Sequence, residues 1–161
     1  MTIKVLFRIF AWQLIFMVNL ILNKKASFEY FVLDRILAGI QLMGTEVKSI
    51  RATKASISEA YCHIINGEVF IKNMHISEYA NIKHTNHAPL RDRKLLLNKK
   101  EIQKLSKAIK EKGLTIVPLA VKLSDTGFIK IEIGLVKGKK TFDKRDSIKE
   151  KDAKRELAKD I

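Results

Sequence analysis

The stretch AYCHIINGEVFIKNMHI, residues 60–76, decides the fold of this chain. Asn66 and Gly67 stand in its middle, and this pair suits a two-residue type I′ turn because both central positions need a positive φ. The runs on either side of the pair have the composition of strands. The sequence therefore predicts an antiparallel β-hairpin that turns at residues 66–67.

Three further segments have the composition of strands. Residues 29–33 read EYFVL, and residues 114–123 (LTIVPLAVKL) and 127–136 (GFIKIEIGLV) flank a turn at 125–127. The last segment alternates apolar and polar side chains, as a half-buried strand does. Pro118 has no N–H to donate to a ladder, so we expect a sheet edge or a bulge at that position.

Residues 98–113 predict a helix. Asn98 can cap it, Glu101 follows three residues later as a capping box requires, and Gly113 is a suitable stop. The spacing of the apolar residues gives the helix one hydrophobic face, made of Ile102, Leu105 and Ile109.

Short antiparallel strands with one or two helices predict a mainly β, α+β domain over residues 23–136. We expect a small closed OB-like β-barrel flanked by helices, because such a barrel closes its own edges and commonly binds oligonucleotides. Periodicity alone leaves an open α+β sheet as the alternative.

The chain carries a large positive charge. Lys and Arg number 31 against 17 Asp and Glu, which makes the formal net charge +14 for 161 residues. The partners of such a surface are nucleic acid, an anionic membrane or an acidic protein. Nucleic acid is favoured because phosphates offer dense charge and release counterions on binding. A charge that serves only solubility is the alternative.

Three basic stretches concentrate this charge. They are NKKAS at 23–27, RDRKLLLNKK at 91–100 and GKKTFDKR at 138–145. Basic residues with an aromatic between them, as around Phe142, suit RNA, because phosphates need cations and unpaired bases need a flat surface. A solvated charged face explains any one stretch, but three in one small domain favour RNA binding.

The tail, residues 137–161, mixes charges of both signs and has few apolar residues. A pair such as Glu150 and Lys154 adds only about 0.2–0.5 kcal/mol to a helix. A helix that is polar all round is not stable alone. We therefore expect this basic tail to be disordered in the free protein and to fold as a helix inside a charged groove, such as one made of RNA.

No pattern for catalysis stands out. There is no Walker loop and no GxGxxG motif. The single cysteine, Cys62, is expected to be a small buried hydrophobe. His84 and His87 have a spacing that could suit a metal, but their segment is loop-like and has no neighbouring thiol or carboxylate. We predict no enzyme, no metal site and no cofactor.

Residues 1–22 form an apolar extension that is interrupted by Arg8, Gln13 and Asn19. A membrane anchor, a helix packed on the domain and an incorrect start codon are the competing interpretations. We favour a native start at Met17, with residues 1–16 outside the native protein. A membrane-tethered interaction protein is the alternative function.

Five stretches in order carry a resemblance to a known family: NKKA from Asn23, AGIQLMGTEVKSIRATKASI from Ala38, NGEVFIKNMHIS from Asn66, NHAPLRDRKLLLNKKEI from Asn86 and GKKTFDKRDSIKEKDAKRE from Gly138. With them the chain closely resembles the small protein B family, the SsrA-binding proteins. The resemblance extends over nearly everything from residue 23 onward.

This resemblance implies a non-catalytic, cytoplasmic bacterial protein that acts in trans-translation. It would bind the tRNA-like domain of transfer-messenger RNA and deliver that RNA to stalled ribosomes, so that incomplete proteins are tagged for degradation. The tail would occupy the empty mRNA channel and the decoding centre, against small-subunit ribosomal RNA. We expect a monomer when free, without stable membrane association.

The resemblance also assigns residues. Those expected at the RNA interface are Asn23, Lys24, Lys25, Arg91, Arg93, Lys94, Leu96 and Lys99. Those expected in the ribosome-contacting tail are Lys139, Lys140, Phe142, Asp143, Lys144, Arg145 and Lys149. Two positions depart from the family pattern: Leu37 stands where glutamate is common, and Phe142 stands where histidine or tyrosine is common. Phe142 keeps a flat ring for stacking but loses a hydrogen-bonding edge.

Overall fold

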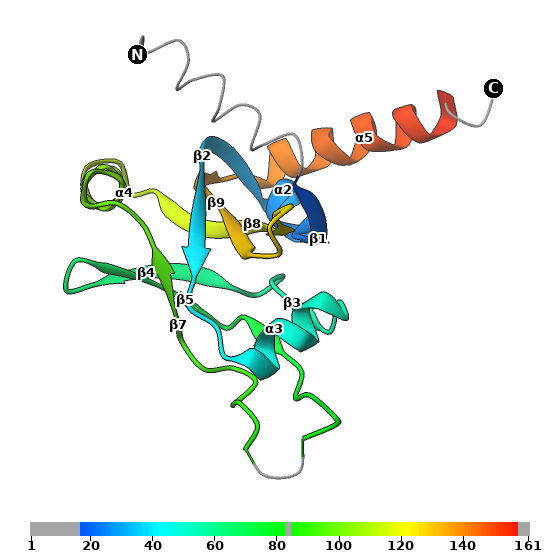
Figure 1. The fold of residues 1–161 in the computed structure, drawn as a ribbon. Coiled ribbons are helices and arrows are strands. Elements are labelled where there is room, and N and C mark those ends of the chain that lie inside the picture. Colours follow the sequence, from blue (N-terminus) through cyan, green and yellow to red (C-terminus); the bar gives the residue numbers. More distant parts are fainter. Residues whose placement is uncertain (1–16, 83–84, 158–161) are drawn as a thin grey trace, which may run out of the picture.

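The computed structural model describes residues 17–82 and 85–157 of the chain (Figure 1). The predictions about residues 1–16 and about His84 therefore fall outside the described part. Among the described residues, no helix is long and apolar enough to cross a membrane.

Antiparallel strands form the body of the molecule. Within the described residues, seven of them share one sheet in the order β1-β8-β4-β5-β7-β2-β9, and β8 also pairs with β9, so that six strands from β8 to β9 close into a ring. A second sheet has two short strands. The strands are β1 (Val18–Leu22), β2 (Tyr30–Ile40), β3 (Ala55–Ser56), β4 (Tyr61–Ile65), β5 (Glu68–Lys72), β6 (His75–Ile76), β7 (Arg93–Leu96), β8 (Thr115–Leu123) and β9 (Ile129–Gly138).

Helices stand around this sheet, as Figure 1 shows. The described residues contain four: α2 (Lys24–Glu29), α3 (Gly44–Arg51), α4 (Lys99–Lys112) and α5 (Thr141–Leu157). The mainly β, α+β fold class expected from the sequence is confirmed at this level.

The hairpin predicted from residues 60–76 is present as β4 and β5. Ile65 pairs with Glu68 across the turn, and Asn66 and Gly67 have φ angles of 49° and 75°. Both central residues thus have the positive φ that a type I′ turn needs. The hairpin joins the ring on both sides, because β4 also pairs with β8 and β5 with β7.

The bulge expected at Pro118 is present in β8. The pairing of β8 with β9 shifts its register between Pro118 and Ala120. The carbonyls freed there are used by Asn23, whose side-chain Nδ2 donates to the Pro118 oxygen at 2.9 Å and whose backbone N–H donates to the Leu119 oxygen at 2.8 Å. The bulge therefore fastens the segment after β1 to the sheet.

Helix α4 agrees with its sequence signals. The backbone N–H of Asn98 donates to the Glu101 carboxylate at 2.8 Å, and Gly113 ends the helix with a φ of 61°. Leu105, in the middle of its predicted apolar face, is buried. This face covers one side of the strand ring.

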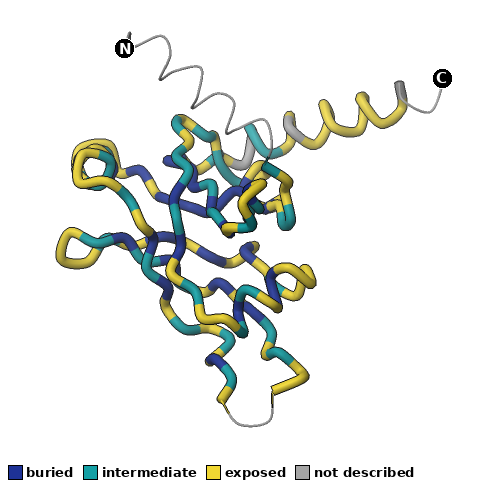
Figure 2. Tube along the Cα trace, viewed as in Figure 1, coloured by how far each residue is buried: buried dark blue, intermediate teal, exposed yellow. Residues whose placement is uncertain are grey.

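The hydrophobic core follows the strands, where Figure 2 shows most of the buried positions. Ile131 and Ile133 of β9 are fully buried with Val69 and Ile71 of β5, whereas Phe128 before β9 is exposed. The alternation of apolar and polar residues over 127–136 therefore correctly predicts which side chains of β9 face the core. The side chains that fill the ring come from strands far apart in the sequence.

The folded part begins before residue 23, where the sequence analysis placed its boundary. Residues 18–22, assigned to the apolar extension, form β1 and pair antiparallel with β8 from Val18 against Leu123 to Leu22 against Ala120. A short apolar run has no periodicity that separates strand from helix. Its partner strand lies about 100 residues further along the chain, so only the tertiary fold identifies it.

Residues 141–157 form helix α5, whereas the sequence predicted a tail without structure in the free chain. The helix projects from the body and is exposed along most of its length (Figure 2). The Lys140 backbone N–H donates to the Asp143 carboxylate at 3.0 Å, and Glu150 accepts from Lys154 at 2.8 Å. These two contacts are local to the helix, one in its first turn and one between side chains four residues apart.

Candidate nucleic-acid interface

Arg91 and Arg93, both predicted to bind RNA, form ion pairs with Glu46. We call these three residues the Glu46 cluster. Glu46 of α3 is fully buried, and its carboxylate accepts from Arg91 Nε at 2.8 Å and from Arg93 Nε at 2.7 Å. The backbone N–H of Met43 donates to the same carboxylate at 2.7 Å. The cluster joins α3 to the segment that enters β7.

The prediction that Arg93 contacts RNA is wrong in this structure, because Arg93 is 0% exposed. Its guanidinium donates to the carbonyls of Met74 at 2.7 Å and Pro89 at 3.1 Å as well as to Glu46. Arg91 keeps 26% of its side chain exposed but is held by Glu46 at 2.5 Å. A buried charge must be paired, and the partner of this one lies 47 residues away in the sequence.

The burial of Glu46 would by itself raise its pKa, since a charged group is disfavoured away from water. Hydrogen bonds from Arg91, from the Met43 N–H and from Arg93 outweigh that effect and hold the pKa of Glu46 below its usual range. The carboxylate is therefore ionised at neutral pH and neutralises part of the charge on the two arginines.

Asn23 is also a structural residue and does not lie on the RNA-binding surface to which it was assigned. It is buried, and its Oδ1 accepts from the Ala26 N–H at 2.9 Å, which caps α2. Its Nδ2 donates to the carbonyls of Ile57 at 3.0 Å and Pro118 at 2.9 Å. The side chain thus ties three segments together and has no donor left for a ligand.

The two lysines after Asn23 lie on the surface at the start of α2. Lys24 and Lys25 are both exposed, and Lys25 Nζ contacts the Glu59 carboxylate at 2.6 Å. The hydrogen bond to Glu59 raises the pKa of Lys25. Both ammonium groups are open to solvent and available to phosphates.

The half-buried Lys94 and the exposed Leu96 and Lys99 form a second surface group, the Leu96 patch. Leu96 is 55% exposed on β7 and pairs with Gly39 of β2. A Cβ at Gly39 would lie 3.2 Å from Leu96 Cβ, so the glycine lets the leucine sit close over the neighbouring strand. Lys94 pairs with Glu68, and Lys99 is exposed at the first turn of α4. An apolar side chain between cations is thereby presented to solvent.

Lys139 anchors the tail to the body. Its backbone N–H donates to the Glu29 carbonyl at 2.9 Å, and its Nζ donates to the Ser27 carbonyl at 3.1 Å. The same ammonium lies 5.0 Å from the centre of the Phe31 ring, a cation–π distance. Lys139 therefore sets the direction in which α5 leaves the sheet.

The remaining residues assigned to the tail lie along the start of α5 and just before it. Lys140, Arg145 and Lys149 are exposed, and Lys144 is half-buried. Asp143 accepts from the Lys140 backbone, so its carboxylate helps to begin the helix. The side chain of Phe142 lies outside what the structure describes.

Sequence reasoning missed the contacts that hold these surfaces in place. Besides Glu46, the buried His87 has Nδ1 2.8 Å from Thr45 Oγ1 and Nε2 3.1 Å from the Ile76 carbonyl. Phe31, which receives Lys139, was taken only as a strand residue. Glu46 and Thr45 stand in the GTEVKS stretch, but their type and spacing carry no signal of burial.

The described part of the chain places no group of three or more His, Cys, Asp or Glu residues where they could hold a metal ion. Cys62 is buried, and burial raises the pKa of its thiol, which makes it a poor nucleophile at neutral pH. His63 and His75 are exposed strand residues, and His87 is occupied by Thr45.

Comparison with known proteins shows which family this chain belongs to. The family model described as SmpB protein matches residues 20–161. The chain belongs to the SmpB family. Its relatives include the SsrA-binding protein of Phocaeicola vulgatus, which is 52% identical over 84% of this chain and 90% of that protein. The SsrA-binding protein of Cytophaga hutchinsonii is 58% identical over 84% of this chain and 88% of that protein.

A solved structure supports the same membership of the SmpB family. A chain described under "tmRNA-SmpB: a journey to the center of the bacterial ribosome" is 38% identical to this one, with a TM-score of 0.65, and the match covers 77% of this chain and 87% of that chain. The family resemblance inferred from the sequence is therefore confirmed, as is the prediction that the chain is not an enzyme, because the SmpB family is non-catalytic.

Proposed function

We propose that this SmpB-family chain binds the tRNA-like domain of transfer-messenger RNA and delivers that RNA to stalled ribosomes for trans-translation. The observation that carries the proposal is its identity of 52% and 58% to SsrA-binding proteins, over most of both chains. SsrA is transfer-messenger RNA. The net charge of +14 supplies the attraction for phosphates that such a partner requires.

The ring of strands acts in this proposal as an OB-like barrel that presents two contact areas. Lys24 and Lys25 on α2 neutralise phosphates, and the Leu96 patch places an apolar side chain against a base or sugar between two lysines. The exposure of these side chains supports the assignment. The buried Asn23 and Arg93 and the half-buried Arg91 hold the surface in shape.

Helix α5 enters the empty mRNA channel and reaches the decoding centre in this proposal, where it meets small-subunit ribosomal RNA. Its exposed Arg145 and Lys149 support contacts with phosphates. The anchor at Lys139 gives the helix a defined direction from the body. The site of action is the bacterial cytoplasm, where the protein is a monomer until it meets its RNA and is not stably bound to a membrane.

A filter-binding titration tests the proposal. The full chain and a chain begun at Met17 are titrated with transfer-messenger RNA and with an ordinary tRNA at two salt concentrations. We expect a clear preference for transfer-messenger RNA by both proteins, with affinity that falls as salt rises because counterions are released on binding. Equal affinity for the two RNAs would mean that the surface binds by charge alone and would contradict the proposal.

A further inference from the structure

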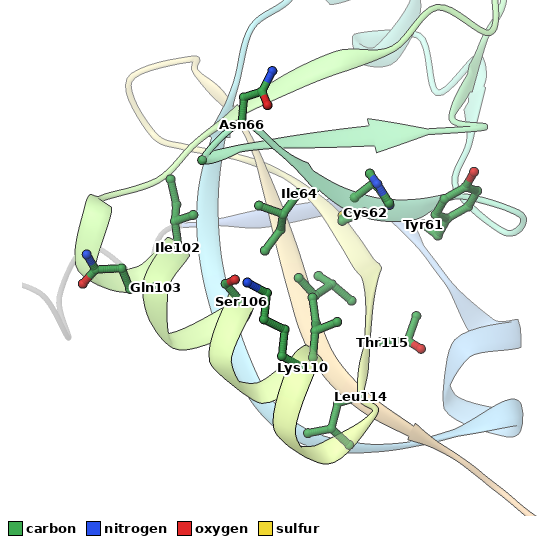
Figure 3. Close-up of a pocket in the computed structure, with 14 residues that line it drawn as sticks. Tyr61, Cys62, Ile64, Asn66, Ile102, Gln103, Ser106, Lys110, Leu114 and Thr115 are labelled. Carbon is green, nitrogen blue, oxygen red and sulfur yellow. The ribbon is translucent and has the colours of Figure 1, made fainter.

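A groove lies between α4 and strand β4 (Figure 3). Its volume is about 570 Å³, within the range of sites that enclose small ligands. Ile64 of β4 faces Ser106 and Lys110 of α4 across it, Ile102 stands near one end and Tyr61 at the other. Neither the Leu96 patch nor the lysines of α2 line it.

The lining combines an apolar floor with a basic, polar rim. The floor includes Ile64, Ile109 and the buried Ile116, and the described lining residues contain no carboxylate. Lys110 is exposed at the rim and makes no ion pair with any other described residue. Its helix carries six lysines against two glutamates. An anionic occupant with an apolar, flat part suits this chemistry.

The groove also connects two surfaces that are far apart in the sequence. At one end it shares Gly67 and Ile102 with a hollow of about 380 Å³ that contains Lys94 and Leu96. At the other end it shares Tyr61 and Thr115 with a hollow of about 290 Å³ that contains Lys25. The three hollows therefore form one continuous track from the Leu96 patch to α2.

We infer that this track is the path of a single RNA strand and that the groove seats one of its unpaired nucleotides. Tyr61, 40% exposed, offers its ring to the base. Lys110 binds the adjoining phosphate, and the floor of isoleucines accepts the remaining face of the base. The inference rests on the proposed function and adds to it a subsite between the two contact areas.

Continuity decides between RNA and an acidic peptide as the occupant. A peptide with an aliphatic anchor would also fit an apolar groove with a basic rim. RNA is favoured because the two flanking hollows open onto the two contact areas of the proposed function. One holds Lys94, which pairs with Glu68, and the other holds Lys25 beside Glu29 and Glu59. Base stacking on an aromatic ring beside cations is the usual mode for unpaired RNA.

The first test fills the groove. Ser106→Trp should weaken binding of the tRNA-like domain about tenfold, whereas Ser106→Ala should bind as the unchanged protein does. Lys110→Ala should lower the slope of log affinity against log salt by about one. Lys107→Ala is the matched control, because Lys107 lies on the same helix outside the groove and pairs with Glu111 at 4.0 Å. It should change the affinity by less than about twofold.

The second test keeps the groove open. A Ser106→Cys protein is treated with a maleimide with and without the tRNA-like domain, beside a Lys107→Cys protein. Both proteins also carry Cys62→Ala, because the buried Cys62 lines the same groove and must not contribute to the labelling. Bound RNA should slow labelling at position 106 by about tenfold and leave position 107 unchanged.

Three results would separate the alternatives. In the first, the RNA binds the unchanged protein without slowing labelling at position 106, and Ser106→Trp leaves its affinity unchanged. In that case the groove is not the path of the RNA, while the proposed function stands. Protection that needs whole ribosomes and is absent with RNA alone would also overturn the inference, in favour of a ribosomal partner. If the unchanged protein does not bind the RNA at all, the proposed function itself fails.

Discussion

Glu46 is fully buried, and each of its two carboxylate oxygens accepts hydrogen bonds. Its buried carboxylate holds two guanidinium groups and a backbone N–H, so the chain from α3 to β7 depends on one negative charge. Replacing a buried ion pair by apolar residues can be neutral, but removing one partner leaves the other charge uncompensated. The function of Glu46 is therefore to hold Arg91 and Arg93 inside the protein.

We predict that Glu46→Gln lowers the free energy of unfolding by about 3 kcal/mol, because two arginines lose their counter-charge. Urea denaturation followed by circular dichroism measures it. Glu68→Gln is the control, since it removes an exposed pair with Lys94 and should cost less than about 1 kcal/mol. Equal effects of the two changes would show that the Glu46 cluster contributes no more than a surface pair.

The same carboxylate predicts a dependence of stability on pH. The pKa of Glu46 is lowered in the folded protein from a usual value of 4.5. Its contribution is therefore fully present above about pH 4.5 and is lost as the pH falls through the lower folded value. Thermal melting between pH 7 and pH 3 should show a steeper loss for the unchanged protein than for Glu46→Gln. Parallel curves would rule out Glu46 as a source of the acid sensitivity.

Leu96 is an exposed apolar side chain that stands between Lys94 and Lys99 in the sequence. We predict that Leu96→Ala weakens binding of the tRNA-like domain about tenfold and leaves the melting temperature nearly unchanged, because its side chain is mostly in water. Leu90→Ala is the matched control, since Leu90 is 58% exposed outside the Leu96 patch. If both leucines affect RNA binding equally, the patch is not a specific contact.

At the scale of elements, α5 differs from every other helix of the described chain. Helices α2, α3 and α4 each bury at least one residue, whereas the described side chains of α5 are exposed or half-buried. Its link to the body is the Lys139 anchor on α2 and β2. A helix held at one end and exposed elsewhere is suited to insert into a channel formed by another molecule.

A chain that ends at Gly138 should separate the two roles. We expect it to bind the tRNA-like domain within about threefold of the full chain, because the Leu96 patch and α2 remain, and to lose tagging of incomplete proteins on stalled ribosomes. Filter binding and a tagging reaction with purified ribosomes are the two measurements. Normal tagging by the shortened chain would refute the role proposed for α5.

At the scale of the whole molecule, closure of the ring depends on contacts between distant segments. Asn23 illustrates this, because one side chain joins the start of α2, the segment at Ile57 and the bulge at Pro118. Its position between β1 and α2 also sets where Lys24 and Lys25 stand. Loss of these bonds would loosen the N-terminal edge of the sheet and the contact area on α2 together.

We predict that Asn23→Ala lowers the free energy of unfolding by about 2 kcal/mol, because a helix cap is lost and two buried carbonyls lose their donor. Lys24→Ala should leave stability unchanged and weaken RNA binding with a lower salt slope. Chemical denaturation and RNA titration of both variants make the comparison. If the Asn23→Ala protein has normal stability but binds RNA weakly, Asn23 contacts the RNA and its structural role is refuted.

The sequence alone predicted the elements whose signals lie within a few neighbouring residues. The turn at Asn66 and Gly67, the limits of α4 and the bulge at Pro118 follow from the backbone demands of single residues and of short spacings. The family resemblance likewise rested on short ordered stretches, and it indicated RNA as the partner. These features need no knowledge of what lies across the fold.

Burial and long-range pairing were decided by the tertiary structure alone. Arg93 and Lys94 are neighbours of the same charge, yet one is wholly buried against Glu46 and the other stands at the surface. Strand β1 is specified by its pairing with β8, and the groove under α4 by the approach of a hairpin and a helix. Side-chain type determines what a residue can bind, but the partner that it meets depends on which distant segments the core brings together.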